Sequence, residues 1–212
     1  MDFRAPLPSA PLPGTQPPSR AFFIDRWGTL FQGPQGKACF KFEDLVFLEG
    51  AIDALYRVQQ AGWLIYLIGN EDSVAFGKQS LASWEKLEYA FTEHLASHGV
   101  NIQRNYACLD HPEGKGRHAN DSVFHLPNTG AFYHAAQHDG VQLRESWVVG
   151  DGCLELAAGW RAGCHVARIT PPIGRAGPPE TLEVDPEMRA SNLADILARV
   201  RKANEFQDCS KR

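Results

Sequence analysis

Short apolar segments that end in small or acidic residues limit the fold of this chain more than any other feature. They predict buried strands at 21–24, 63–68, 106–108, 147–149 and 165–167. Helical periodicity fills the intervals, at about 49–60, 78–98, 129–139, 153–162 and 192–203. Alternating strands and helices imply right-handed crossovers. We therefore predict an α/β fold: a three-layer sandwich with a central parallel sheet between two layers of helices.

The domain organisation follows from length and from proline content. The chain has 212 residues, and six of its 14 prolines lie in residues 1–20. We predict a disordered Pro-rich tail at 1–20, one domain at 21–205 and a frayed C-terminus at 206–212. Only the stretch from Trp27 to Glu49 separates the first strand from the first helix, so no separate cap domain is expected. The predicted rim consists of loops at 32–42 and 109–123.

Charge and cysteine content exclude several classes of partner. Lys and Arg number 21 against 25 Asp and Glu, a net charge of −4 without long runs of either sign, so no nucleic acid is expected. The most apolar stretch, 63–68, is far shorter than the roughly 20 residues of a membrane span, so no membrane is expected either. Five widely spaced cysteines and an N-terminus without an apolar core predict a reduced, cytoplasmic protein. A protein partner stays open, because the Pro-rich tail could bind a proline-recognising domain.

Two carboxylates follow predicted strands directly. Asp25 ends the first strand, and Asp151 follows the strand at 147–149. Ligands of parallel sheets bind where the strands end, so both carboxylates should meet at one crevice. A carboxylate there can attack an electrophile or hold a divalent cation with a second carboxylate. The alternative is that Asp25 only caps a turn.

Several segments, in the right order, carry a resemblance to a known family. Residues 23–30, Phe-Ile-Asp-Arg-Trp-Gly-Thr-Leu, resemble the first motif of the haloacid dehalogenase superfamily, Asp-x-Asp-Gly-Thr. The arginine is typical of the D,D-heptose 1,7-bisphosphate phosphatase and histidinol-phosphate phosphatase branch. Residues 68–71 resemble its Val-Thr-Asn-Gln, 108–114 its Cys-x-His-His-Pro segment, and 149–151 its last motif. The similarity spans roughly residues 21 to 200.

This resemblance implies a Rossmann-like fold and a phosphatase mechanism. Asp25 would be the catalytic nucleophile and would form a phosphoaspartate with a small phosphorylated substrate. Mg²⁺ would be the cofactor, held by Asp25, Asp151 and the backbone carbonyl of Trp27. Asn70, Thr29 and Arg26 would bind the substrate.

The chain also departs from the family pattern at positions that face phosphate. Trp27 replaces the second Asp of the first motif, the general acid and base of the family. Gly69, Phe76 and Leu126 replace polar or charged residues of the branch. We therefore expect weak phosphatase activity, because indole has no titrating group. The first alternative is a catalytically inactive relative that acts as a binding or assembly protein. The second is a dehalogenase-like hydrolase, because dehalogenases of the superfamily carry an aromatic residue at this place.

A zinc ion is not expected at the place where this branch often holds one. The four corresponding positions are occupied by Cys108, Asp110, Ser122 and Phe124. Of these, only Cys108 keeps the ligand type of the branch. The histidines at 111, 118 and 125 recur every seven residues and could form a different set with Cys108 or Asp121, which we also consider unlikely on spacing alone.

Overall fold

The computed structural model describes residues 19–32, 41–170 and 182–210. In these residues six parallel strands form one sheet, in the order β3-β2-β1-β4-β5-β6. The strands are β1 (Ala21–Asp25), β2 (Leu64–Asn70), β3 (Arg104–Cys108), β4 (Trp147–Gly150), β5 (His165–Ile169) and β6 (Met188–Ala190). The predicted parallel sheet is confirmed, and each predicted strand overlaps one of these elements; the strand predicted at 63–68 begins one residue later, at Leu64.

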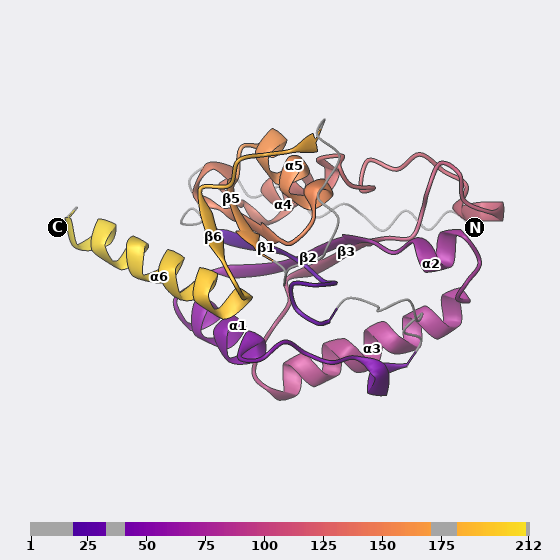
Figure 1. The fold of residues 1–212 in the computed structure, drawn as a ribbon, viewed down its shortest axis with the longest axis horizontal. Coiled ribbons are helices and arrows are strands. Elements are labelled where there is room, and N and C mark those ends of the chain that lie inside the picture. The colour runs from indigo at the N-terminus through magenta and orange to yellow at the C-terminus, as the bar shows by residue number, and fades with distance from the viewer. Residues whose placement is uncertain (1–18, 33–40, 171–181, 211–212) are drawn as a thin grey trace.

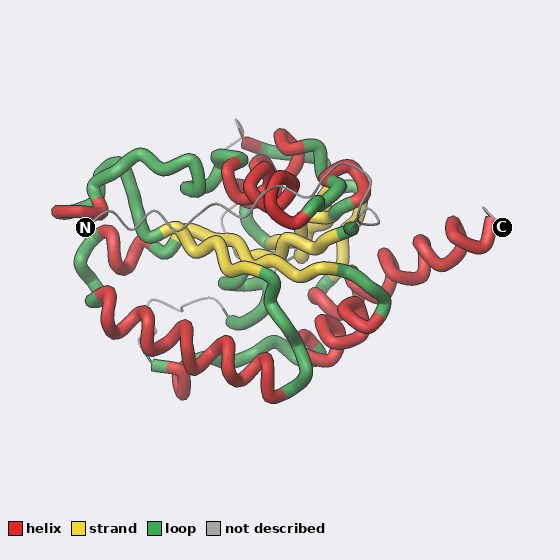
Figure 2. The backbone as a smooth tube through the Cα atoms, turned by 180° about the vertical axis from the view of Figure 1, so that it is seen from behind, coloured by secondary structure: helices red, strands yellow, loops and turns green. Residues whose placement is uncertain are grey.

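Helices cover both faces of the sheet, as predicted. They are α1 (Ala51–Gln60), α2 (Asp72–Ala75), α3 (Leu81–Ser97), α4 (Gly130–Asp139), α5 (Cys153–Ala162) and α6 (Leu193–Ser210). In Figure 1, α1, α3 and α6 lie below the sheet and α4 and α5 lie above it. The view from behind shows the same layers, with the strands between the two groups of helices (Figure 2).

Alternation along the buried strands divides the core in two. Phe22 and Ile24 of β1 point toward α1, α3 and α6, whereas Ala21 and Phe23 point toward α4 and α5. The uninterrupted apolar runs of β1 and β2 are explained by this arrangement, because both faces of a central parallel strand are covered. Close packing is visible at Gly159 of α5, where a Cβ would lie 2.2 Å from Val148 Cγ1.

Three features of the fold differ from the prediction. The edge strand β6 and the single-turn helix α2 are not apparent in the hydrophobic pattern, because both are too short to show a period. The first described residues already pair: the N–H of Gln142 donates to the Ser19 carbonyl, two residues before the predicted domain boundary. Helix α6 continues to Ser210, into the stretch predicted to fray. Residues 1–18 of the tail predicted at 1–20, and most of the 32–42 rim, lie outside the described residues.

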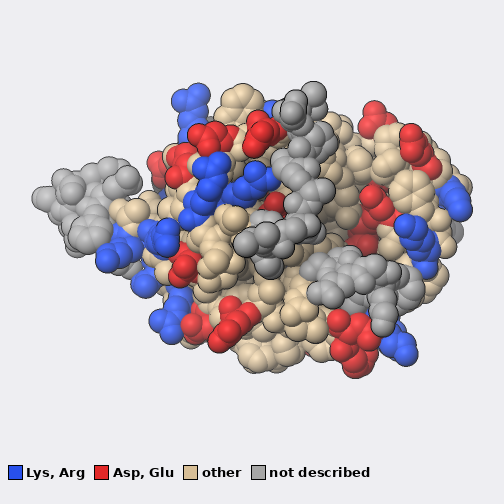
Figure 3. Space-filling model, in the orientation of Figure 1, with Lys and Arg blue, Asp and Glu red and all other residues tan. Residues whose placement is uncertain are grey.

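The surface carries charges of both signs. On the face shown in Figure 3, acidic and basic side chains are interspersed, and basic ones gather toward the end where α6 protrudes. The described helices include none with the length and apolarity that a bilayer crossing requires.

A partly buried carboxylate joins the sheet to α4. Asp139 accepts hydrogen bonds from the Tyr66 hydroxyl at 2.9 Å and from two nitrogens of Arg104 at 2.9 and 3.0 Å. Burial alone would raise the pKa of Asp139, but the hydrogen bonds from Arg104, Tyr66 and Gln103 outweigh it and lower the pKa. Asp139 therefore binds its partners as a carboxylate.

We expect Asp139→Ala to lower the free energy of unfolding at pH 7 by about 2–3 kcal/mol, because the hydrogen bonds that its carboxylate accepts from Tyr66, Arg104 and Gln103 are lost. The folded-state pKa is depressed, so this stabilisation is present above the unfolded pKa of about 4 and is lost as the pH falls through the folded value. Urea unfolding at pH 7 and pH 3 measures the difference. Asp53→Ala is the control, because its pair with Arg57 is exposed; equal losses in both variants would contradict the prediction.

Candidate active site

The crevice where ligands bind in such sheets lies at the switch in strand order. Strands β1 and β4 are neighbours in the sheet, and the connections that follow them run to opposite faces of it. Asp25 is the last residue of β1, and Asp151 is the first residue after β4. The structure therefore brings together the two carboxylates that the sequence predicted to meet.

A third carboxylate joins them, and the sequence reading missed it. Glu155 lies in the first turn of α5, and one oxygen each of Asp25, Asp151 and Glu155 lies within 4.8 Å of the others. Its side chain folds back so that Oε1 accepts from the Gly152 N–H. A Cβ on Gly150 would lie 2.3 Å from that oxygen, so the fold-back needs glycine. The available signal was an acid four residues after Asp151, at the start of a helix.

Asp25 and Glu155 repel each other when both are ionised. Burial raises the pKa of Asp25 well above its ordinary value, and the charge of Glu155 raises it further. Hydrogen bonds from the Arg26 N–H and the Thr29 hydroxyl oppose the shift without cancelling it. Burial also raises the pKa of Glu155. A divalent cation would relieve this repulsion, and an all-oxygen donor set is the type that Mg²⁺ prefers, so the residues present fit the ion.

Thr29 fixes the carboxylate of Asp25. Its hydroxyl donates to Asp25 Oδ2 at 3.2 Å, and the side chain is fully buried. The turn depends on Gly28, whose φ is 84°, a conformation that favours glycine. Thr29 thus positions Asp25, and its buried hydroxyl does not offer the substrate contact that the family resemblance implied.

The prediction that Arg26 binds substrate needs correction. Arg26 is 2% exposed, and its guanidinium pairs with Glu88 of α3. It also lies over the rings of Phe31 and Phe91, at 6.0 and 5.7 Å from their centroids. Its charge is therefore used to dock α3 against the first-strand loop, where burial of the unpaired ion would be costly.

Trp27 connects two loops at the edge of the crevice. Its ring packs edge-on against Phe31 with centroids 5.0 Å apart. Its Nε1 donates to Glu71 Oε2, a long hydrogen bond of 3.4 Å. Glu71 directly follows β2, so the indole spans from the loop after β1 to the loop after β2. An aromatic ring occupies this part of the rim, at the position where the family carries the second Asp of its first motif.

Asn70 ties the end of β2 to a distant loop. Its amide nitrogen donates to the Leu126 carbonyl at 3.0 Å, and its Oδ1 accepts from the Leu126 N–H at 2.8 Å. Both ends of the amide are thus used within the protein. Each end has one further hydrogen-bonding position, so the predicted substrate contact stays a prediction.

The histidine set that the sequence raised only as an alternative, His111, His118 and His125, does not assemble as one group. His118 turns away to pair with Asp110, 3.0 Å from its Oδ1. His111 and His125 do meet, with ring centroids 4.9 Å apart. Cys108 instead donates to the Asp110 carbonyl at 3.4 Å.

The fold and the cluster of Asp25, Asp151 and Glu155, called the carboxylate cluster below, together define a protein of the haloacid dehalogenase class. No protein-family model matches the chain. A D-glycero-alpha-D-manno-heptose-1,7-bisphosphate 7-phosphatase of Burkholderia mallei is 33% identical over 147 residues, which cover 68% of this chain and 76% of that protein. A D-glycero-D-manno-heptose-1,7-bisphosphate 7-phosphatase of Thermosynechococcus vestitus is 31% identical over 153 residues, 70% of this chain and 77% of the relative.

Solved structures show the same fold. The D,D-heptose 1,7-bisphosphate phosphatase of B. bronchiseptica, crystallised with magnesium and phosphate, aligns with a TM-score of 0.72 and 21% identity. The alignment covers 87% of this chain and 99% of that one. The chain belongs to the heptose-1,7-bisphosphate 7-phosphatase family of the haloacid dehalogenase superfamily.

Proposed function

We propose that this protein is a phosphohydrolase that acts on a small phosphorylated sugar. The observation that carries the proposal is the meeting of Asp25, Asp151 and Glu155 at the switch in strand order. Relatives named for heptose 1,7-bisphosphate support a sugar phosphate as the substrate class. The B. bronchiseptica structure with magnesium and phosphate supports Mg²⁺ as the cofactor.

Each residue has a proposed role in the reaction. An oxygen of Asp25 attacks phosphorus, the bond from phosphorus to the sugar oxygen breaks, and a phosphoaspartate forms. Water then attacks that phosphorus, which releases phosphate and restores the carboxylate. Asp25, Asp151 and the Trp27 carbonyl would hold Mg²⁺, which neutralises the phosphate dianion when bound. Thr29 holds the attacking carboxylate in place, and Asn70 faces the substrate from the β2 loop.

Trp27 makes the first step dependent on the leaving group. Indole cannot protonate the departing oxygen, so a sugar alkoxide must take its proton from water. We expect slow hydrolysis of alkyl phosphates and faster hydrolysis of aryl phosphates, whose phenolate needs no acid.

The test is phosphate release from p-nitrophenyl phosphate and from heptose 1,7-bisphosphate by the full chain. Hydrolysis should require added Mg²⁺ and should stop when EDTA removes it. Asp151→Asn should need a higher Mg²⁺ concentration, because one cation ligand loses its charge. Hydrolysis that does not respond to Mg²⁺, or no hydrolysis of either ester, would overturn the proposal.

The second candidate is a binding or assembly protein that has lost catalysis. The observation that favours it is the internal use of polar groups around the crevice: Arg26 pairs with Glu88 and the Asn70 amide pairs with Leu126. Absence of turnover, with Mg²⁺ bound and the fold intact, would favour this candidate. Halide release from a 2-haloacid without added metal would favour the dehalogenase alternative instead.

A further inference from the structure

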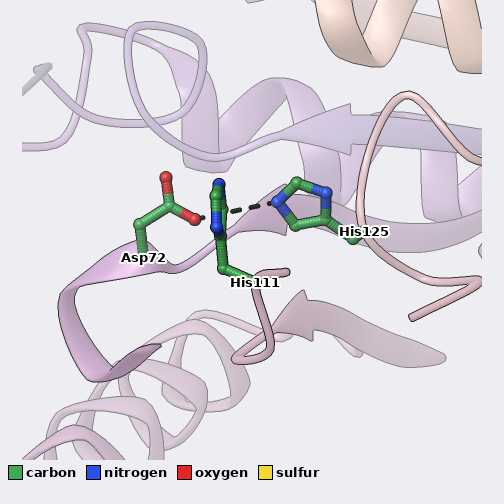
Figure 4. A group of neighbouring side chains, drawn as sticks. All are labelled: Asp72, His111 and His125. Atoms are coloured by element: carbon green, nitrogen blue, oxygen red, sulfur yellow. Dashed lines mark ion pairs between the residues drawn. The ribbon is translucent and has the colours of Figure 1, made fainter. Parts of the chain in front are cut away.

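Three side chains of types that can bind metal ions meet outside the carboxylate cluster, and they come from separate segments. Asp72 is the first residue of α2, His111 lies in the loop after β3, and His125 lies in the segment before α4. One ligand atom of each lies within 4.8 Å of the others. Figure 4 shows the Asp72 carboxylate and the His125 ring pointing toward each other, with the His111 ring seen edge-on beside the line that joins them.

The facing atoms lack other partners in the part of the chain that the structure describes. Asp72 Oδ1 and His125 Nε2 are both buried without a hydrogen bond. They are 3.9 Å apart, too far to bond one another directly. Buried polar atoms are rarely left unsatisfied, so this pair needs an explanation.

The geometry points to one divalent transition metal ion, of which zinc is the archetype, held by Asp72, His111 and His125. Nitrogen and oxygen ligands around tetrahedral zinc are about 3.3 Å apart, so small side-chain movements close the 3.9 Å gap. Two imidazoles disfavour Mg²⁺ and Ca²⁺, which prefer all-oxygen sets. Three protein ligands leave a coordination position open to water or to a ligand oxygen.

This set is distinct from the two other metal positions that the sequence raised. Its residues are not the four at which related phosphatases often hold zinc: Cys108, Asp110, Ser122 and Phe124. Two of those positions make internal contacts, since Asp110 pairs with His118 and the Cys108 thiol donates to the Asp110 carbonyl. The carboxylate cluster of Asp25, Asp151 and Glu155 is a separate set with oxygen ligands only.

Metal binding would join three segments at the rim of the crevice. Asp72 lies two residues after Asn70, and His125 directly precedes Leu126, to which the Asn70 amide is bonded. The ion would therefore reinforce the contact that holds the Asn70 side chain. It would also place positive charge beside this rim.

The tautomer of His111 provides an independent readout. Its Nδ1 accepts from the Glu113 N–H at 3.0 Å. A metal on Nδ1 takes that lone pair, and a metal on Nε2 moves the ring proton to Nδ1. In either case this hydrogen bond is exchanged for the metal bond, so the backbone amide resonance of Glu113 should shift on loading.

The experiment is a titration of the untagged, chelator-treated full chain with Zn²⁺. Mg²⁺ is present throughout, so that it occupies the carboxylate cluster. Calorimetry should give one equivalent, and Co²⁺ should produce visible absorption typical of a low-coordinate site. His125→Ala should weaken Zn²⁺ binding at least about tenfold, and Asp72→Asn should do so as well. Zn²⁺ should raise the Tm of the wild type but not of these variants.

Two controls assign the ion. His118→Ala removes a histidine of the same region that pairs with Asp110, and it should bind Zn²⁺ like the wild type. Asp151→Asn should also retain Zn²⁺, because Asp151 belongs to the carboxylate cluster and not to the proposed zinc site. Metal-free His125→Ala should unfold near the wild-type temperature; if it does not fold, Asp72→Asn and the Glu113 resonance decide. Absence of Zn²⁺ binding, undiminished binding in both ligand variants, or loss in Asp151→Asn would overturn the proposal.

Discussion

Asp25→Asn is expected to reduce Mg²⁺-dependent hydrolysis of p-nitrophenyl phosphate by about 10³-fold or more, because the amide oxygen is a poor nucleophile. The substitution preserves shape, and the Thr29 hydroxyl can still donate to the amide oxygen that replaces Oδ2. Steady-state rates at saturating Mg²⁺ measure the loss. A variant that keeps the wild-type rate would place the nucleophile elsewhere.

Stability provides the control for this variant. The folded-state pKa of Asp25 is raised by burial and by Glu155, so its ionised form destabilises the metal-free protein. That cost appears as the pH rises from the unfolded pKa of about 4 through the folded value. Metal-free Asp25→Asn should therefore be at least as stable as the wild type at pH 7. A large fall in Tm would mean that lost activity reflects unfolding rather than lost chemistry.

Trp27→Asp is expected to raise the rate on heptose 1,7-bisphosphate by about 10²–10⁴-fold, the usual contribution of a general acid and base. The position lies two residues after Asp25, in the loop that Gly28 turns. The new carboxyl could protonate the departing sugar oxygen and then accept a proton from the attacking water. The rate on p-nitrophenyl phosphate should change far less, because that leaving group needs no acid.

Trp27→Asn is the matched control. It removes the same indole, the same contact with Phe31 and the same hydrogen bond to Glu71, but it introduces no titrating group. If Asn and Asp variants gain equally on the sugar phosphate, the gain comes from opening the rim. If neither gains, Trp27 does not stand where an acid is needed.

Much of the site could be predicted because strand ends are encoded locally. Asp25 and Asp151 each follow a short apolar run, and parallel pairing of β1 with β4 brings such residues to one edge. Glu155 could not be assigned in this way, because its part in the site depends on a side chain folding back beneath Gly150. The motif at Arg26 was also not enough to assign its role, because the sequence does not reveal that Arg26 forms an ion pair with Glu88 of α3.

The histidines show the same limit. The regular spacing of His111, His118 and His125 suggested one set. In an irregular loop, however, spacing along the sequence does not determine where each side chain points. His118 pairs with Asp110, and the third member of the observed cluster comes from α2, far away in sequence.

By itself, the sequence determined the layered α/β fold, the family and the place of the two strand-end carboxylates. The fold and the two carboxylates follow from hydrophobic periodicity and from residues adjacent to strands, which act over a few positions along the chain. The family follows from the resemblance of several motifs in the right order. The tertiary structure decided which charged side chains form ion pairs within the protein, as Arg26 does. It also decided which candidate metal ligands lie close together, as Asp72, His111 and His125 do. Both outcomes depend on contacts between distant segments, and burial makes those contacts decisive because an unpaired polar group is costly away from water.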